Sequence, residues 1–313
     1  VGATKHTILL GAEIIDTENN NLRYDTFWST TSDDNEVFNI SRPMDFAINA
    51  DGLATEVNFT TSLKSKTNSE IKVTSVYIQD QIDLTENIKL MLGGRHDNFD
   101  ITVTDIKNGT AENRKDSMFS PRAGLVFKPS DDLSIYWSYS ESFLPRSGEQ
   151  YKSLSASSAR LDPDVFESSE IGLKYQLSPR LSMSLASFSS EQIRAERDND
   201  TGENSEVRGL TVDGLEFQIK GKISDKLDLI AGYSSLDGET SSGGEPRELP
   251  DHTLSLFAKY QVNGKLDFAL GMTRQGESLI KDNSPGLSLP EYTRVDFGVY
   301  YKLENGMDVQ INI

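Results

Sequence analysis

The chain has 313 residues, of which 36% are hydrophobic and 26% charged, and its mean hydropathy is −0.47. The sequence contains no run of 18 or more apolar residues, so it predicts no membrane-spanning helix. A membrane β-strand carries polar residues at alternate positions, so a search for continuous apolar runs does not detect it. A water-soluble all-β protein and a membrane β-barrel therefore both remain open at this point.

The charge and the residue types exclude several kinds of function. Acidic residues outnumber basic ones 49 to 31, for a net charge of −18, so no basic field would hold a nucleic acid. The absence of cysteine excludes disulfides, thiolate metal sites and a cysteine nucleophile. The histidines His6, His96 and His252 lack the close spacing of a metal site.

The predicted strands begin near the N-terminus and become regular further along the chain. Residues 7–16 and 22–27 each have the pattern of a strand, and a long polar excursion is predicted over 29–69. From Ile71 onward, apolar and polar residues alternate, most clearly at 171–177, 254–262, 295–303 and 307–313. Side chains of a strand point alternately to its two faces, so each segment has one mainly apolar and one mainly polar face. Roughly fourteen segments have this pattern.

Short turns and long polar connections alternate between these strands. Short turns are predicted at 85–87, 129–132, 178–180, 224–226, 263–264 and 304–306, and two of them contain Asn-Gly, which favours tight hairpins. Long connections are predicted at 107–117, 146–163, 196–206, 237–250 and 281–290. A meander of this kind gathers the short turns at one end and the long loops at the other, as in outer-membrane barrels.

Two other all-β folds are weighed against the barrel. A propeller could share a period of about 40 residues, but no per-blade motif is evident. An antiparallel sandwich also has short strands, but 313 residues of uniform meander are long for a sandwich. The polar faces carry many charged residues, which suits a wet lumen better than a packed core. The apolar faces would then contact lipid, and aromatic residues near strand ends would form interfacial girdles, although aromatic residues favour strands in general.

Eight short strings follow one another along the predicted strands. They are Val76-Tyr77-Ile78-Gln79-Asp80-Gln81, Leu92-Gly93-Gly94-Arg95-His96-Asp97, Phe119-Ser120-Pro121-Arg122-Ala123-Gly124-Leu125, Ser138-Tyr139-Ser140-Glu141-Ser142-Phe143-Leu144-Pro145, Glu170-Ile171-Gly172-Leu173-Lys174, Val207-Arg208-Gly209-Leu210, Gly214-Leu215-Glu216 and Leu289-Pro290-Glu291-Tyr292-Thr293-Arg294-Val295-Asp296. Together and in this order, they resemble the barrel of TonB-dependent siderophore receptors, with a leaning towards the ferrichrome- and catecholate-type receptors. The resemblance covers the chain from about Lys5 to its end.

The resemblance implies a fold and a place in the cell. The expected fold is all-β, an antiparallel up-and-down transmembrane β-barrel formed by one domain over residues 1–313. This domain would supply roughly fourteen strands of a 22-stranded barrel, would be incomplete at both ends, and would lack the plug domain. The resemblance further implies a monomer in the outer membrane of a Gram-negative bacterium, surrounded by lipid and lipopolysaccharide.

The resemblance also implies a transport function. A ferric siderophore would bind at the extracellular loops and would be imported with energy from the TonB–ExbB–ExbD complex, which would act through the plug domain. No catalytic residue, cofactor or protein metal ligand is expected, because no bond is made or broken and the iron stays inside its siderophore. Nucleic acid is not an expected partner.

Candidate ligand contacts are aromatic or basic residues on the long-loop side, because many ferric siderophores are anionic or carry aromatic donors. Two groups fit this description: Tyr24, Phe27 and Trp28 beside one long connection, and Arg146, Gln150 and Tyr151 at the start of another. The alternative interpretation is strand or girdle packing for the first group and a solvated loop for the second.

Three other functions remain open from the sequence. A passive porin has fewer strands and an open channel. A TonB-dependent transporter of cobalamin, haem or an oligosaccharide would share the barrel and differ in its loops. A surface receptor or adhesin would bind a ligand without importing it.

Overall fold

The computed structural model describes residues 4–25, 62–146, 154, 161–197, 204–304 and 306–313. Regular structure within these residues is entirely β, and this part of the chain contains no helix that could cross a membrane. The strands are β1 (Lys5–Asp25), β2 (Ser62–Asp83), β3 (Ile88–Asp105), β4 (Thr110–Phe127), β5 (Leu133–Leu144), β6 (Asp164–Ser178), β7 (Leu181–Arg197), β8 (Asn204–Ser224), β9 (Leu227–Thr240), β10 (His252–Gln261), β11 (Leu266–Gln275), β12 (Ser278–Leu279), β13 (Ser288–Leu289), β14 (Tyr292–Lys302) and β15 (Asp308–Asn312).

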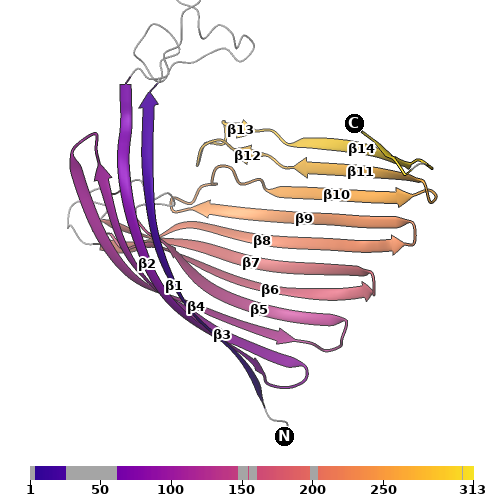
Figure 1. Ribbon diagram of the computed structural model, residues 1–313, viewed down its shortest axis with the longest axis horizontal. Coiled ribbons are helices and arrows are strands. Elements are labelled where there is room, and N and C mark those ends of the chain that lie inside the picture. The colour runs from indigo at the N-terminus through magenta and orange to yellow at the C-terminus, as the bar shows by residue number, and fades with distance from the viewer. Residues whose placement is uncertain (1–3, 26–61, 147–153, 155–160, 198–203, 305) are drawn as a thin grey trace, which may run out of the picture.

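Thirteen strands form one antiparallel sheet in which chain neighbours lie side by side. The order is β1 to β11 in sequence, then β14 and β15, while β12 and β13 pair separately. Figure 1 shows the sheet curling, with β1–β4 steeply inclined to the later strands and the chain meandering from one edge to the other. The prediction of an antiparallel up-and-down β architecture is therefore confirmed.

The ends of the strands also follow the prediction in most places. Turns of a few residues join β2 to β3, β4 to β5, β6 to β7, β8 to β9, β10 to β11 and β14 to β15, all at one end of the sheet. The opposite end carries the connections that follow β5, β9 and β11, which are longer. One predicted long connection is wrong, because 107–117 is mostly strand β4, which begins at Thr110 after a short turn.

The N-terminal strands were also predicted too short. Residues 7–16 and 22–27 belong to one element over most of their length, because β1 runs unbroken for 21 residues from Lys5 to Asp25. Its polar half carries no apolar alternation, yet each residue pairs with β2, as Glu18 does with Glu70 and Asn21 with Thr67. The predicted excursion over 29–69 is shortened for the same reason, since β2 starts at Ser62. Backbone pairing with a neighbour carries these strands where side-chain pattern does not.

The two faces of the sheet differ in composition and burial. We call the face that carries Ile78, Leu92 and Leu125 the outer face, and the face that carries Ser75 and Asp97 the inner face; the register keeps each set on one side. Large apolar residues stand exposed along the outer face, whereas the buried side chains of β2, β3 and β4 all lie on the inner face. This difference is expected when the inner face is the concave side of the curled sheet.

The apolar residues change faces along β2 and β3. Near the short turn they lie on the outer face, where Val76 is 57% exposed. Near the long-loop end they lie on the inner face, where Ile71 and Ile101 are buried with Val73 and Val103 in a small core. At that end the outer face is polar. In β2 and β3, the half near the short turn thus has the pattern of a lipid-facing wall, and the half near the long loops has the pattern of a protein in water.

Two loops at the long-loop end lock together. Arg247, in the connection after β9, bridges to Leu279 of β12, and its backbone N–H donates to the carboxylate of Asp282 at 2.7 Å. The N–H of Asn283 donates to the carbonyl of Glu245 at 3.0 Å. These contacts join the β9–β10 loop to the β11–β14 loop across the end of the intervening hairpin.

Candidate functional site

The inner face of the sheet is the candidate functional surface, and a hollow lies at its C-terminal side. The hollow has a volume of about 660 Å³ and spans β8–β11, β14 and β15. Its floor is low because small residues face it from adjacent strands, among them Gly232, Ala269, Gly271 and Gly298. A recess with polar, aliphatic and aromatic side chains in its lining therefore opens here.

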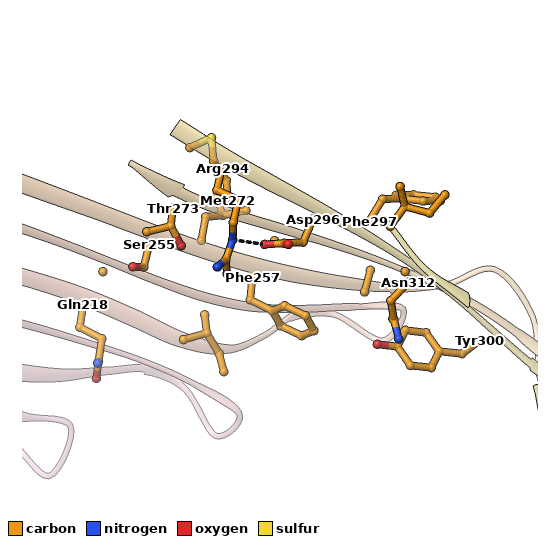
Figure 2. A pocket seen from close by; sticks show the side chains of 17 residues that line it. Gln218, Ser255, Phe257, Met272, Thr273, Arg294, Asp296, Phe297, Tyr300 and Asn312 are labelled. Atoms are coloured by element: carbon orange, nitrogen blue, oxygen red, sulfur yellow. Dashed lines mark hydrogen bonds and ion pairs between the residues drawn. The ribbon is translucent and has the colours of Figure 1, made fainter. Parts of the chain in front are cut away.

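Charged and aromatic groups stand around this hollow. Figure 2 shows Arg294 and Asp296 side by side on β14, and Arg294 Nε donates to Asp296 Oδ2 at 3.0 Å. Phe257 lies beneath this pair, while Tyr300 and Asn312 line the far side. The arrangement can hold polar and flat groups by hydrogen bonds and stacking.

A second, smaller hollow of about 350 Å³ lies on the inner face of β5–β10. The hydroxyl of Tyr136 donates to Glu170 Oε1 at 2.5 Å, and Lys174 Nζ lies 5.3 Å from the centre of the Tyr136 ring. Glu216 of β8 lines the same hollow. Two carboxylates thus face the concave side here, where a partner that carries cationic groups would find acceptors.

A third polar group lies on the inner face of β1–β3. Arg95 donates through Nη2 to Glu13 Oε2 at 2.7 Å and through Nε to Asp97 Oδ1 at 2.8 Å. Asp97 is only 4% exposed and also accepts a hydrogen bond from the hydroxyl of Ser75. Each charge in this network has a partner, as a buried charge requires.

Arg146, one of the predicted ligand contacts, lies in an ion-pair cluster at the long-loop end. Its Nη1 lies 2.9 Å from Asp164 Oδ1, and its Nε donates to the carbonyl of Asp162 at 2.6 Å. Asp164 also accepts from the side-chain amide of Gln192 at 2.9 Å, and Arg194 Nε lies 3.5 Å from its carboxylate. These contacts fix the start of the β5–β6 connection, and a ligand contact of Arg146 stays a prediction.

Of the other predicted ligand contacts, only Tyr24 lies within the described residues. Tyr24 lies near the end of β1, beside an irregularity in the register with β2, and is 41% exposed. Phe27, Trp28, Gln150 and Tyr151 lie outside the described residues. Their role as ligand contacts stays a prediction.

The sequence did carry a signal for the charged inner-face pairs. Residues two apart on a strand share a face, so an arginine followed two positions later by an aspartate can pair on one side of the sheet. Three such pairs lie on the inner face, each with its Nε–Oδ distance: Arg95–Asp97 (2.8 Å), Arg114–Asp116 (2.7 Å) and Arg294–Asp296 (3.0 Å). An arginine and an aspartate two positions apart on a strand therefore predict an intramolecular pair.

Contacts with residues of the turns lower the pKa of two carboxyls, Asp105 and Asp225. The backbone N–H of Asn108 lowers the pKa of Asp105 in the turn after β3. Arg180 lowers the pKa of Asp225 through a hydrogen bond of 2.7 Å that links the β6–β7 turn to the β8–β9 turn. No group of three or more potential metal ligands occurs among the residues with a described position.

Comparison with known proteins agrees with this geometry. Residues 3–313 match the family described as "TonB dependent receptor-like, beta-barrel". The chain is 29% identical to the ferrioxamine receptor of Yersinia enterocolitica over 99% of its own length and 44% of that protein. It is 27% identical to the probable TonB-dependent siderophore receptor PiuA of Acinetobacter baumannii over 79% of its own length and 37% of that protein.

Solved structures show the same fold. The crystal structure of PiuA from Acinetobacter baumannii has a TM-score of 0.75 at 23% identity and is matched over 99% of this chain and 48% of its own. The ferric-catecholate import receptor Fiu of E. coli K12 in its closed form also has a TM-score of 0.75, at 18% identity, over 99% of this chain and 47% of its own.

The curled antiparallel sheet, apolar outside and polar inside, defines a membrane β-barrel wall. The chain belongs to the TonB-dependent receptor-like β-barrel family, a family of receptors and transporters rather than enzymes. It spans less than half the length of these relatives.

Proposed function

We propose that the chain forms part of an outer-membrane receptor that binds a ferric siderophore at its extracellular loops and imports it with energy from TonB. The observation that carries the proposal is the opposition of faces: an apolar outer wall suited to lipid and a hollowed, charged inner wall suited to protein and water. The names of the relatives, which include ferrioxamine, ferrichrome and catecholate receptors, support a ferric siderophore as the cargo.

The proposed mechanism assigns a separate task to each region. The long-loop end, with Tyr24, Phe27, Trp28, Arg146, Gln150 and Tyr151, would face the cell exterior and capture the ligand. The inner face would hold a plug, and its paired charges and small residues would let such a domain pack closely and move. The TonB–ExbB–ExbD complex would supply the force through the plug. The protein would act as a monomer surrounded by lipid and lipopolysaccharide, and the iron is cargo that needs no ligand from the protein.

Uptake of labelled iron by iron-starved cells tests the proposal. Cells that express the receptor would be offered ferrichrome-like, catecholate and mixed ferric siderophores, with cobalamin, haem and an oligosaccharide as other cargoes. We expect saturable uptake of one ferric siderophore that disappears in cells without TonB. Uptake that ignores TonB, or that rises linearly with any small solute, would instead identify a passive porin. Saturable binding without uptake would identify a surface receptor.

Arg146 offers a test of the capture site, because its partner is known. If Arg146 contacts the ligand, Arg146→Ala weakens siderophore binding and the double variant Arg146→Ala/Asp164→Ala remains weak. If Arg146 only fixes the loop through Asp164, removal of both charges restores much of the binding, since the buried carboxylate that lost its closest ion pair is removed as well. Lysine at position 146 is the control that keeps the charge.

A further inference from the structure

A shallow groove lies on the outer face of β5–β9, at the upper limit of the apolar band. The register defines three rows of directly opposed residues that cross these five strands. The first row is Trp137, Ile171, Ser187, Leu215 and Ser235. The second row is Tyr139, Ser169, Ser189, Asp213 and Asp237, and the third is Glu141, Glu167, Glu191, Thr211 and Glu239. Below the first row the outer face is apolar, and above it the outer face is polar.

Small residues hollow this surface between an aromatic wall and an acidic wall. The groove has a volume of about 650 Å³, and serines of the first two rows, such as Ser187 and Ser235, leave its floor low. Trp137 forms one wall with 41% of its surface exposed, and its Nε1–H donates to Ser169 Oγ at 3.2 Å. Asp213 and Asp237, which oppose each other on β8 and β9, line the other side.

The charges around the groove select the kind of ligand. The second and third rows hold six carboxylates, and none of the fifteen positions, all of them described, carries lysine or arginine. A phosphate would be repelled from such a surface. A neutral ring with several hydroxyl donors suits it, because carboxylates accept strong hydrogen bonds and an exposed tryptophan face packs well against a flat ring.

We propose that this groove binds the sugar headgroup of a glycolipid in the outer leaflet. The inference rests on the proposed outer-membrane location. The sugar ring packs on Trp137, and its hydroxyls donate across the groove towards Asp213, which Asp237 opposes. The acyl chains continue down the apolar band past Ile171 and Leu215, which places headgroup and tails on the matching parts of one surface. The lipid then belongs to the wall of the receptor and is separate from the transported cargo.

Lipid retention by the purified receptor tests this site. The receptor is purified in a sugar-free amine oxide detergent and incubated with glucosyl diacylglycerol, phosphatidylglycerol or phosphatidylcholine, and native mass spectrometry counts the lipid retained. We expect one glucosyl lipid per receptor, with retention reduced roughly tenfold in Asp213→Asn/Asp237→Asn. Ser187→Leu, which fills the hollow with a side chain suited to lipid, should abolish retention without removing a charge.

The matched control is Asp16→Asn, which removes an outer-face carboxylate of β1 far along the sheet from the groove. It should retain the glucosyl lipid as the unmodified receptor does, and far-UV circular dichroism checks that each variant is folded. Equal retention of the three lipids, preference for phosphatidylglycerol, or retention that ignores both groove variants would overturn the proposal. Siderophore uptake is measured separately, so a failed lipid site and a failed transport function give different results.

Discussion

Single residues of the inner wall are held in place by short charged contacts that the chain itself provides. Asp97 is nearly buried and accepts from both Arg95 and Ser75, while Arg95 also reaches Glu13. Removal of one partner from such a network costs more than the loss of a surface pair, because the remaining groups stay desolvated.

Asp97→Asn should therefore lower the free energy of unfolding by about 1–3 kcal/mol. The measurement is urea unfolding of the receptor in lipid vesicles, followed by tryptophan fluorescence. Asp100→Asn, which removes a far more exposed carboxylate paired with Lys115 on the outer face of the same strand, is the control and should cost less than about 1 kcal/mol. Equal losses in the two variants would show that burial of Asp97 contributes nothing.

The turn-to-turn contact of Arg180 with Asp225 should depend on pH. In the folded state the pKa of Asp225 lies below the value of an unfolded aspartate, about 3.9. The contact therefore stabilises the folded state above pH of about 3.9, and this stabilisation is lost as the pH falls through the lower pKa of the folded state. The stability difference between the receptor and Asp225→Asn should thus be constant near neutral pH and shrink below pH of about 4. A difference that grows with acid would contradict this assignment.

At the scale of the strand, alternation predicted which segments pair but not where they end. The regular strands and nearly all of the short turns followed from side-chain periodicity and turn residues. The polar half of β1 and the start of β4 did not, because their residues face water on the outer side and are held by backbone pairing with β2 and β3. Alternation of apolar and polar residues cannot identify a strand segment whose outer face is polar.

Glycines opposite aromatic rings are a second strand-level feature. A Cβ on Gly172 would lie 2.6 Å from the Tyr136 ring and 2.8 Å from the carbonyl of Leu185. Tyr77 covers Gly11 and Phe188 covers Gly214 in the same manner, each from the directly opposed position. Such a ring packs over the missing side chain and protects the backbone at a weak point of the strand.

Gly172→Ala should cost about 1–3 kcal/mol, since the backbone carbonyl on the facing strand cannot move aside without loss of pairing. Gly264→Ala, in the β10–β11 turn, is the control, because a Cβ there meets no atom within 4 Å. The two variants should differ in urea midpoint in lipid vesicles. Equal urea midpoints for the two variants would contradict a steric role of the missing side chain at Gly172.

At the scale of the whole molecule, the two faces should respond oppositely to charge. Leu185→Arg places a cation in the apolar band between Leu173 and Phe217 and should cost about 2–4 kcal/mol if the position lies near the bilayer centre. Ser184→Arg, one residue earlier, points to the wet inner hollow and should be close to neutral. Folding yield into vesicles and urea unfolding compare the two, and equal costs would argue against a lipid-facing outer wall.

The candidate site was less predictable than the fold. Loop residues were chosen for their chemistry, but the sequence could not show that Arg146 already binds Asp164, because the two residues come together only through the pairing of β5 with β6. The inner hollow depends on Gly232, Gly271 and Gly298, which line it from three different strands, and only the register brings these strands into place.

The change of faces along β2 and β3 distinguishes the correct register of these two strands from a slipped one in a membrane. Alternation alone cannot detect a strand that slips by two residues, because each side chain would still point to its proper face. The boundary can, because Thr74 opposes Asn98 on its polar side and Ile78 opposes Gly94 on its apolar side, so the polar–apolar limits of the two strands lie within one residue pair of each other. A slip of β2 by two residues toward the short turn would carry Thr74 to the level of Val76, at the edge of the apolar band, and would place Lys72 opposite Asn98. A bilayer around this wall would therefore favour the aligned register of β2 and β3 over the slipped one.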